Sequence, residues 1–179
     1  MALIVQKYGG SSLANAELIK NVARRVAATS DAGNSVVAVV SAMGNATDQL
    51  LDMANQMSSK PEPRELDVLL STGELRSCAL LAMALNSSGH SAISLSGGQA
   101  GIQTDASHGM ARIAGLEPDR ITRELSEGNI VVVAGFQGAT QDMEVTTLGR
   151  GASDLSAVAL AAKLDADLCE VYTDVDGIY

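Results

Sequence analysis

The hydrophobic residues of this chain fall into short unbroken runs that alternate with longer, periodic segments. Residues 36–40 (VVAVV) and 130–134 (IVVVA) are continuous apolar runs, which are typical of strands buried on both faces of a sheet. Residues 3–6, 92–95 and 168–172 are further short runs that we interpret as strands. Polar residues or glycines follow these runs and end the pattern.

Between these runs, apolar residues recur every three or four positions. This spacing predicts helices with one buried face over residues 15–28, 47–57, 118–127 and 154–164. Residues 145–148 are predicted to form one short strand of a hairpin. Strand and helix therefore alternate along the chain, which predicts an α/β fold with a mainly parallel sheet and helices on both faces.

The longest periodic segment, residues 64–85, contains Ser71, Thr72 and Gly73 near its middle. A glycine inside a helix costs about 1 kcal/mol relative to alanine. We therefore predict two helices with a functional joint at this position rather than one continuous helix.

The composition narrows the class of protein. Hydrophobic residues make up 46% of the 179 residues and charged residues 18%, so the chain is not of the disordered class. Against 21 Asp and Glu there are 12 Lys and Arg, a net charge of −9, and only 2% of residues are aromatic. This balance argues against nucleic acid and against an anionic membrane surface as partners.

The sequence carries no sign of secretion, of a membrane span or of a metal centre. The N-terminus lacks a basic region followed by a long apolar stretch, and no unbroken apolar run reaches about 18 residues. Cys78 and Cys169 lie far apart, and His90 and His108 lack metal-ligand spacing. We expect a cytoplasmic protein with no membrane partner and no protein-bound metal.

The first strand leads into Lys7, Tyr8, Gly9 and Gly10, which two serines and a helix follow. In open α/β sheets, ligands collect at the carboxyl ends of the strands. A lysine beside glycine amides at the start of a helix is typical of an anion site, most simply for a phosphate. The Walker A spacing is absent, and an ordinary strand-to-helix turn with a solvated lysine stays open as the alternative.

Two polar residues point to contacts with a substrate. Thr47 follows the second strand in a segment of small residues, and its hydroxyl either meets a ligand or caps a helix. Glu74 lies within an apolar run, where a carboxylate usually has a cationic partner. That partner is Arg76 or another side chain, or it is the ammonium group of a ligand.

Residues 149–154 place an arginine between two glycines just before a helix. The planar guanidinium of Arg150 suits a carboxylate. Ser153 or Asp154 either caps the helix or belongs to the site, where Asp154 could orient a lysine or a metal. After the last strand, Thr173 and the acidic residues beyond it form either a solvated edge or contacts to the ribose or base of a nucleotide.

Five segments, taken in their order along the chain, resemble the aspartokinase family. They are KYGGSS (7–12), VVSAMG (39–44), GEL (73–75), GRGASD (149–154) and YTDVDGIY (172–179). The resemblance spans the whole chain and implies the amino-acid-kinase fold, a three-layer α/β/α sandwich with a mainly parallel central sheet. It also implies ATP-dependent phosphorylation of the β-carboxylate of L-aspartate to 4-phospho-L-aspartate, the first step of lysine, threonine and methionine biosynthesis.

The resemblance implies a role for each matching residue. The positions that would bind ATP are Lys7, Tyr8, Gly9, Gly10, Thr173, Asp174 and Tyr179. Those that would bind aspartate are Thr47, Glu74, Arg150 and Ser153. Lys7 and Asp154 fall at catalytic positions, where Asp154 would organise the phosphate-binding lysines. Mg²⁺ would be held mainly by the phosphates of the nucleotide.

The chain departs from the family pattern in length and in the segment after Gly151, where Leu155 and Ser156 stand at positions that usually hold Thr-type residues. Ala152 stands where the family usually has glycine, so its methyl group could block a positive φ or crowd a ligand. Aspartokinases continue past the position of Tyr179, with more of the nucleotide site and with regulatory ACT domains. The resemblance therefore implies one amino-acid-kinase domain over residues 1–179 that is incomplete at its C-terminus and has no ACT domain.

The missing part of the family pattern leaves two other functions open. The chain could be an ATP- and aspartate-binding or assembly fragment that does not complete the reaction. It could also be a related amino-acid kinase that acts on another carboxylate. The resemblance further implies small-molecule ligands and assembly into a homo-oligomer.

Overall fold

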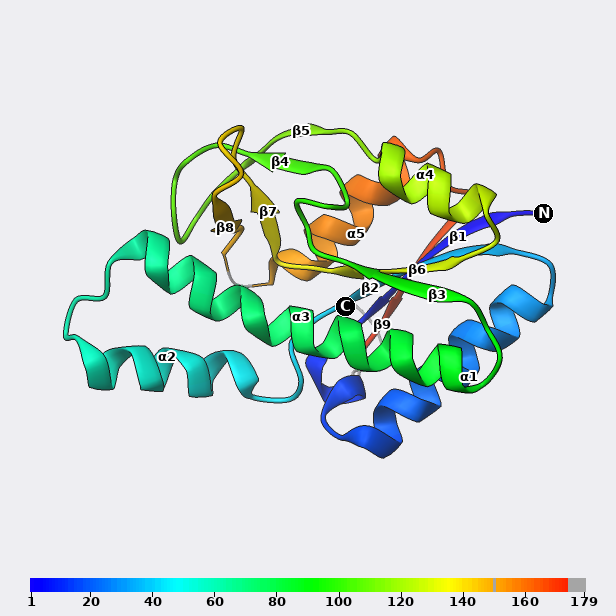
Figure 1. Cartoon of the computed structure of the whole chain (residues 1–179), viewed down its shortest axis with the longest axis horizontal. Coiled ribbons are helices and arrows are strands. Elements are labelled where there is room, and N and C mark those ends of the chain that lie inside the picture. The colour runs from blue at the N-terminus through cyan, green and yellow to red at the C-terminus, as the bar shows by residue number, and fades with distance from the viewer. Residues whose placement is uncertain (150, 174–179) are drawn as a thin grey trace, which may run out of the picture.

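Five parallel strands form the central sheet, in the spatial order β3-β6-β2-β1-β9. The computed structural model describes residues 1–149 and 151–173 (Figure 1). The strands are β1 (Leu3–Tyr8), β2 (Ser35–Val40), β3 (Ala92–Leu95), β6 (Ile130–Ala134) and β9 (Leu168–Tyr172). All five strands predicted from the apolar runs are confirmed, and β1 extends far enough to include the predicted phosphate-binding lysine.

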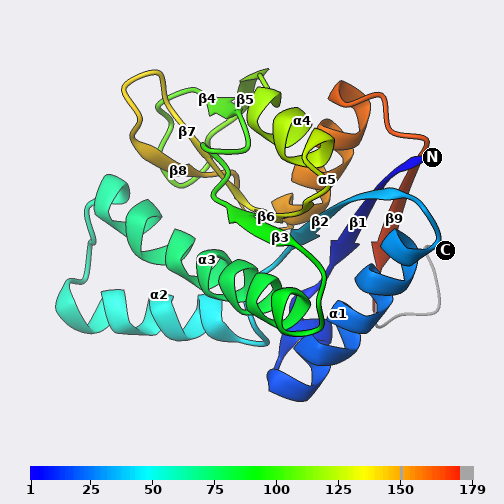
Figure 2. The same ribbon diagram turned by 45° about the vertical axis from the view of Figure 1, so that its right-hand side comes forward.

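Helices cover both faces of this sheet and give the three layers of an α/β/α sandwich (Figure 2). The helices α1 (Ala16–Asp31) and α3 (Pro63–Ser87) lie on one face, and α4 (Asp119–Ser126) and α5 (Ala152–Lys163) lie on the other. A further helix, α2 (Ala46–Met57), packs against α3. This arrangement confirms the predicted fold class.

The core explains why the strand sequences are apolar without interruption. In β2, Val36 and Val40 face α1 and α3, whereas Val37 and Val39 face α4 and α5. These four side chains are at most 1% exposed. Because successive side chains of a strand point to opposite faces, a strand buried on both faces needs an apolar residue at every position.

A second sheet of four short strands has the order β5-β4-β7-β8. Its strands are β4 (Ile102–Thr104), β5 (Ile113–Leu116), β7 (Gln137–Ala139) and β8 (Val145–Thr147). β7 and β8 pair antiparallel, which confirms the predicted hairpin. The hydrophobic pattern does not predict the other three strands of this sheet, because strands of three or four residues carry too little periodicity.

The prediction of two helices within residues 64–85 is wrong, because α3 runs without a break from Pro63 to Ser87. Gly73 lies where α3 packs against the segment that follows β2. A Cβ atom added to Gly73 would lie 3.0 Å from the Cβ of Ala42 and 3.5 Å from the Cδ1 of Leu50. The glycine therefore permits close packing, and the burial of α3 outweighs the helix cost of about 1 kcal/mol.

Within the described residues, α3 is also the one helix that is long and apolar enough, by length and composition alone, to cross a membrane. The mean hydropathy of its most apolar window is 1.4, but half of that window is buried inside the protein. There α3 packs on β3 and β6. Its apolar character therefore matches its position in the core of the sandwich.

Candidate active site

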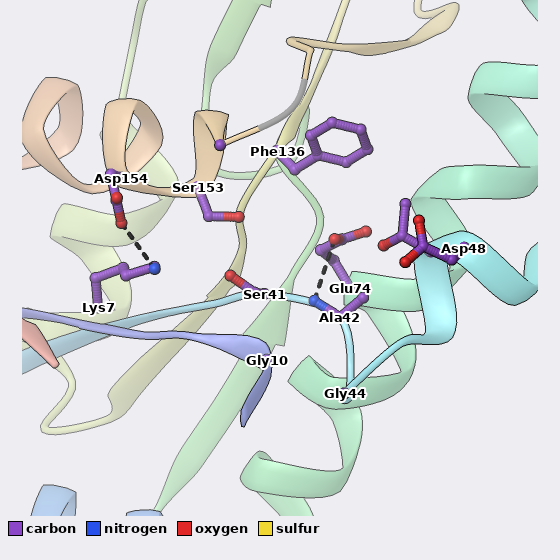
Figure 3. A pocket seen from close by; sticks show the side chains of 12 residues that line it. Lys7, Gly10, Ser41, Ala42, Gly44, Asp48, Glu74, Phe136, Ser153 and Asp154 are labelled. Carbon is purple, nitrogen blue, oxygen red and sulfur yellow. Dashed lines mark hydrogen bonds and ion pairs between the residues drawn. The ribbon is translucent and has the colours of Figure 1, made fainter. Parts of the chain in front are cut away.

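A cavity of about 260 Å³ lies at the carboxyl ends of β1 and β2 and at the N-terminal end of α5 (Figure 3). It is lined by Lys7, Gly10, Ser41, Ala42, Gly44, Thr47, Asp48, Glu74, Phe136, Gly151, Ser153 and Asp154. In Figure 3, Lys7 and Asp154 lie at one end and Glu74 at the other, with Ser41 and Ser153 between them. The fold thus brings predicted site residues from four separate segments into one cavity.

An ion pair forms one end of the cavity. The Nζ of Lys7, in β1, lies 2.7 Å from the Oδ1 of Asp154, in the first turn of α5. The Lys7 side chain is only 12% exposed, so few water molecules compete for its ammonium group. The N-terminus of α5 also presents the positive end of a helix dipole. This end of the cavity therefore suits an anionic group such as a phosphate.

The loop after β1 packs its main chain directly on the loop after β2. A Cβ atom added to Gly10 would lie 2.7 Å from the carbonyl oxygen of Ala42 and 3.1 Å from that of Gly44. The amide of Gly44 donates a hydrogen bond of 2.9 Å to the carbonyl oxygen of Gly10. Gly10 is therefore needed for this approach, whereas an added Cβ on Gly9 would meet its first neighbour only at 3.6 Å.

The side chain of Tyr8 does not line this cavity. It is 1% exposed in the core beside α1, and its ring stacks on Tyr172 with 4.9 Å between the centroids. Thr173 follows β9 and lines a different cavity, together with these two tyrosines. Three predicted site residues lie outside the described residues, namely Arg150, Asp174 and Tyr179.

Glu74 forms the opposite end of the cavity. It projects from α3, is 3% exposed, and its Oε1 accepts a hydrogen bond of 3.1 Å from the amide of Ala42. Its Oε2 has no hydrogen-bond partner within the described part of the chain, so pairing with Arg76 is the wrong alternative. Burial raises the pKa of Glu74 to about 7, although two backbone hydrogen bonds lower it. A buried carboxylate oxygen that lines a cavity without a partner suits a cationic ligand.

Thr47 and Ser153 supply hydroxyl groups to the cavity and are not helix caps. The N-cap residues of α2 and α5 are Asn45 and Gly151. The structure adds Asp48, which follows Thr47 in the first turn of α2 and also lines the cavity. Sequence reasoning misses Asp48, although an acidic residue beside a predicted ligand contact is a usable signal.

Phe136 is a second cavity residue that sequence reasoning misses. It follows β6 with a φ of 67°, in the left-handed region that non-glycine residues rarely adopt. Its amide donates to the Oγ of Ser156 at 3.2 Å, and its carbonyl oxygen accepts from the amide of Leu148 at 2.8 Å. The signal in the sequence is the one Phe of the chain, placed just after the most apolar strand.

Ala152 does not disturb the backbone at this site. It is the first residue of α5 and is not among the residues with a positive φ. Its methyl group is buried in an apolar cluster with Leu70 and Phe136. The expected conflict between alanine and a positive φ therefore does not arise at this position.

Comparisons with known proteins place these observations in a family. A family model described as "Amino acid kinase family" matches residues 2–179. The aspartokinase of Mycolicibacterium smegmatis is 60% identical over 180 residues, which cover 100% of this chain and 43% of that protein. The chain therefore spans less than half the length of the curated relatives that it matches.

Solved structures give the same result. Aspartate kinase from Synechocystis is 53% identical with a TM-score of 0.86, and the match covers 99% of this chain and 29% of that one. E. coli aspartokinase III, solved in complex with aspartate and ADP, is 26% identical with a TM-score of 0.83, and the match covers 99% of this chain and 50% of that one. The resemblance to aspartokinases is confirmed, and the chain belongs to the amino acid kinase family.

Proposed function

We propose that this chain carries the phosphate-binding and aspartate-binding residues of an aspartate kinase. The enzyme would transfer the γ-phosphoryl group of ATP to the β-carboxylate of L-aspartate, giving 4-phospho-L-aspartate and ADP, the first step of lysine, threonine and methionine biosynthesis. One observation carries the proposal. A single cavity holds the cation of Lys7 at one end and the buried carboxylate of Glu74 at the other, and one oxygen of that carboxylate has no hydrogen-bond partner among the residues that the structure describes.

At the phosphate end, the ammonium group of Lys7 would donate hydrogen bonds to the phosphate oxygens of ATP. Asp154 would keep that ammonium in place through the 2.7 Å ion pair. The main chain of Tyr8, Gly9 and Gly10 would lie along the phosphates, because the Tyr8 side chain is buried in the core. The contacts to ribose and base would come from residues after β9, namely Thr173, Asp174 and Tyr179.

Mg²⁺ enters this proposal together with the nucleotide. The part of the chain that the structure describes contains no cluster of three or more His, Cys, Asp or Glu side chains that could hold a metal ion. Mg²⁺ binds phosphate oxygens readily and keeps several water ligands, so the nucleotide would hold it. Bound there, the cation neutralises phosphate charge, and Lys7 supplies the protein's own share of that neutralisation.

At the other end of the cavity, the protein would bind the α-ammonium group and the α-carboxylate of aspartate. The Oε2 of Glu74 would accept a hydrogen bond from the ammonium group, which would give a partner to an oxygen that has none within residues 1–149 and 151–173. The hydroxyls of Thr47 and Ser153 line the same cavity and would donate to the α-carboxylate. We assign the bidentate grip on that carboxylate to Arg150, on the basis of the family motif.

The chemistry needs no general base. The β-carboxylate of aspartate is already ionised at pH 7, because its pKa is about 4. One of its oxygens forms a bond to the γ-phosphorus while the bond from that phosphorus to the bridging oxygen breaks, and ADP leaves with the electron pair. The protein's contribution is therefore positioning and charge neutralisation.

The first test replaces Lys7 with alanine in the native-length protein. The acyl phosphate is trapped with hydroxylamine and measured as the hydroxamate, with ATP and aspartate as substrates. We expect kcat to fall on the order of 100-fold or more, with a change in the KM for aspartate of less than about threefold. Lys20→Ala is the matched control, because Lys20 is exposed and pairs with Glu17 on α1. A higher KM with an unchanged kcat would remove Lys7 from the transfer step.

The second test replaces Glu74 with glutamine and varies the acceptor. Loss of a charge-assisted hydrogen bond should raise the KM for aspartate on the order of 10- to 100-fold. The exposed Glu127→Gln, at the end of α4, is the control. N-acetyl-L-aspartate has no ammonium group, so the wild-type protein should phosphorylate it poorly. Equal use of both acceptors, or preference for N-acetyl-L-glutamate, would favour a related kinase for another carboxylate.

Two further expectations complete the proposal. The native protein would work in the cytoplasm, as the sequence features lead us to expect, and it would assemble into a homo-oligomer, as the family resemblance implies. Light scattering coupled to size-exclusion chromatography measures the oligomeric state directly, and a monomer at every concentration tested would contradict that part of the proposal.

A further inference from the structure

Asp67 is a fully buried carboxylate that does not line the cavity. It lies in α3 and is 0% exposed. Its oxygens accept hydrogen bonds from the Oγ1 of Thr147 at 2.5 Å, the Nδ1 of His108 at 2.8 Å and the amide of Gly109 at 3.0 and 3.1 Å. A buried carboxylate is costly unless donors surround it, as they do here. These contacts therefore point to a task beyond packing.

The hydrogen bonds of Asp67 fix the start of the segment that enters the site. Thr147 is the last residue of β8, and the chain continues from it through Leu148 to the N-terminus of α5. Thr147 is also held from the other side, because its carbonyl oxygen accepts from the amide of Ala111 at 2.9 Å. Asp67 thus ties α3 to β8 and to the loop of residues 105–111.

The same contacts reach the wall of the cavity. The amide of Leu148 donates to the carbonyl oxygen of Phe136, the residue with a positive φ that lines the cavity. The side chain of Leu148 packs in the cluster that Phe136 and Ala152 form with Leu70 of α3. The hydrogen bonds that fix Thr147 therefore also fix the position of Leu148. Through Leu148 they fix Phe136 in the cavity wall and the start of the segment that leads to Ser153.

Asp67 and Glu74 stand about two helical turns apart on α3, which puts them on nearly the same side of that helix. One rigid helix then delivers the carboxylate that faces the ligand and the carboxylate that anchors the opposing segment. If α3 shifted by a fraction of an ångström relative to the segment that Asp67 anchors, the distance between Glu74 and the residues of that segment that face the substrate would change.

We infer that Asp67 is a positioning residue for aspartate binding, which acts through its hydrogen bond to Thr147. This inference rests on the proposed aspartate kinase function. It assigns Asp67 no contact with substrate. It predicts that the aspartate site loosens when the Asp67–Thr147 bond is lost, while the phosphate end, formed by Lys7 and Asp154, keeps its affinity for ATP.

The test compares two neighbouring threonines in β8 of the native-length protein. Thr147→Val keeps the shape of the side chain but removes the hydroxyl that Asp67 accepts. Thr146→Val is the matched control, because Thr146 is equally buried and its hydroxyl bonds Thr104 at 2.6 Å, away from Asp67. Thr147→Ser restores the hydroxyl and serves as the rescue. Each variant is measured for the KM values of aspartate and ATP by the hydroxamate assay, and for its urea midpoint.

We expect Thr147→Val to raise the KM for aspartate at least tenfold and the KM for ATP less than twofold, with Thr147→Ser within threefold of wild type. Equal KM values for aspartate in Thr147→Val and Thr146→Val would overturn the inference while leaving the proposed function intact. A wild-type protein that forms no hydroxamate from aspartate would overturn both. If Thr147→Val does not fold, Asp67→Asn takes its place with the same expected and contradicting results.

Discussion

Replacing Glu74 with glutamine is expected to change how the stability of the fold depends on pH. The Glu74 side chain is 3% exposed, and one of its oxygens has no partner within the described residues. Burial raises its pKa from 4.5 to about 7. Between pH 4.5 and about 7, the folded state therefore keeps a proton on Glu74 that the unfolded state has released. Above about pH 7 the folded state must bury the ionised carboxylate, which lowers the free energy of unfolding.

The magnitude follows from the shift. A difference of about 2.5 pKa units, at about 1.36 kcal/mol per unit, corresponds to about 3 kcal/mol. Because the pKa is higher in the folded state, this contribution is favourable below about pH 4.5, is lost as the pH rises through about 7, and is constant above that. Glutamine does not titrate, so the variant lacks this slope. Its constant costs, such as a buried amide, cancel when one pH is compared with another.

The assay is urea unfolding of both proteins at pH 4.5, 6 and 8, without ligand. The free energy of unfolding of Glu74→Gln minus that of the wild type should rise by about 3 kcal/mol from pH 4.5 to pH 8. All other titrating groups are common to both proteins and cancel in the difference. A difference that stays constant with pH would refute the reasoning that burial keeps this carboxylate protonated until neutral pH.

Three further predictions concern the same cavity. Below about pH 7, kcat/KM for aspartate should fall about tenfold per pH unit as Glu74 is protonated, and a flat profile in the wild type would contradict its role at the ammonium group. Gly10→Ala should lower the free energy of unfolding by about 1–3 kcal/mol, because its Cβ would lie 2.7 Å from the carbonyl oxygen of Ala42. Gly9→Ala is the control, because Gly9 has room for a methyl group, and equal urea midpoints for the two variants would contradict this prediction. Ser156→Ala should cost about 1–3 kcal/mol by leaving the Phe136 amide unpaired, and an unchanged thermal midpoint would show that another acceptor replaces the hydroxyl.

The sequence by itself determines the layers of this protein. Continuous apolar runs specify strands buried on both faces, and three-to-four periodicity specifies the helices, because both patterns record which sides of an element leave water. The residues at the strand ends also follow from sequence, since parallel strands deliver their carboxyl ends to one edge of the sheet. Lys7 at the end of β1 and Thr47 after β2 line one cavity for that reason, and α3 adds Glu74 to it.

The tertiary structure alone decides features that depend on contacts distant in sequence. Gly73 signals a helix break by local propensity, yet the packing of α3 on Ala42 makes it a point of close contact. Phe136 has a positive φ, and hydrogen bonds with Ser156 and Leu148 hold its amide and its carbonyl group. The local sequence pattern cannot predict such contacts, because each one joins residues that are not neighbours along the chain.

The local sequence also cannot distinguish the roles of the two buried carboxylates of α3, Asp67 and Glu74. Both look alike in sequence, as acidic residues in an apolar helix. Glu74 lines the cavity, and one of its oxygens has no hydrogen-bond partner in the described part of the chain. Asp67, in contrast, is surrounded by donors that include Thr147, eighty positions away in the chain. Which of them faces a ligand and which holds the fold is set by the partners that folding places around each oxygen, because a buried charge takes its role from its donors.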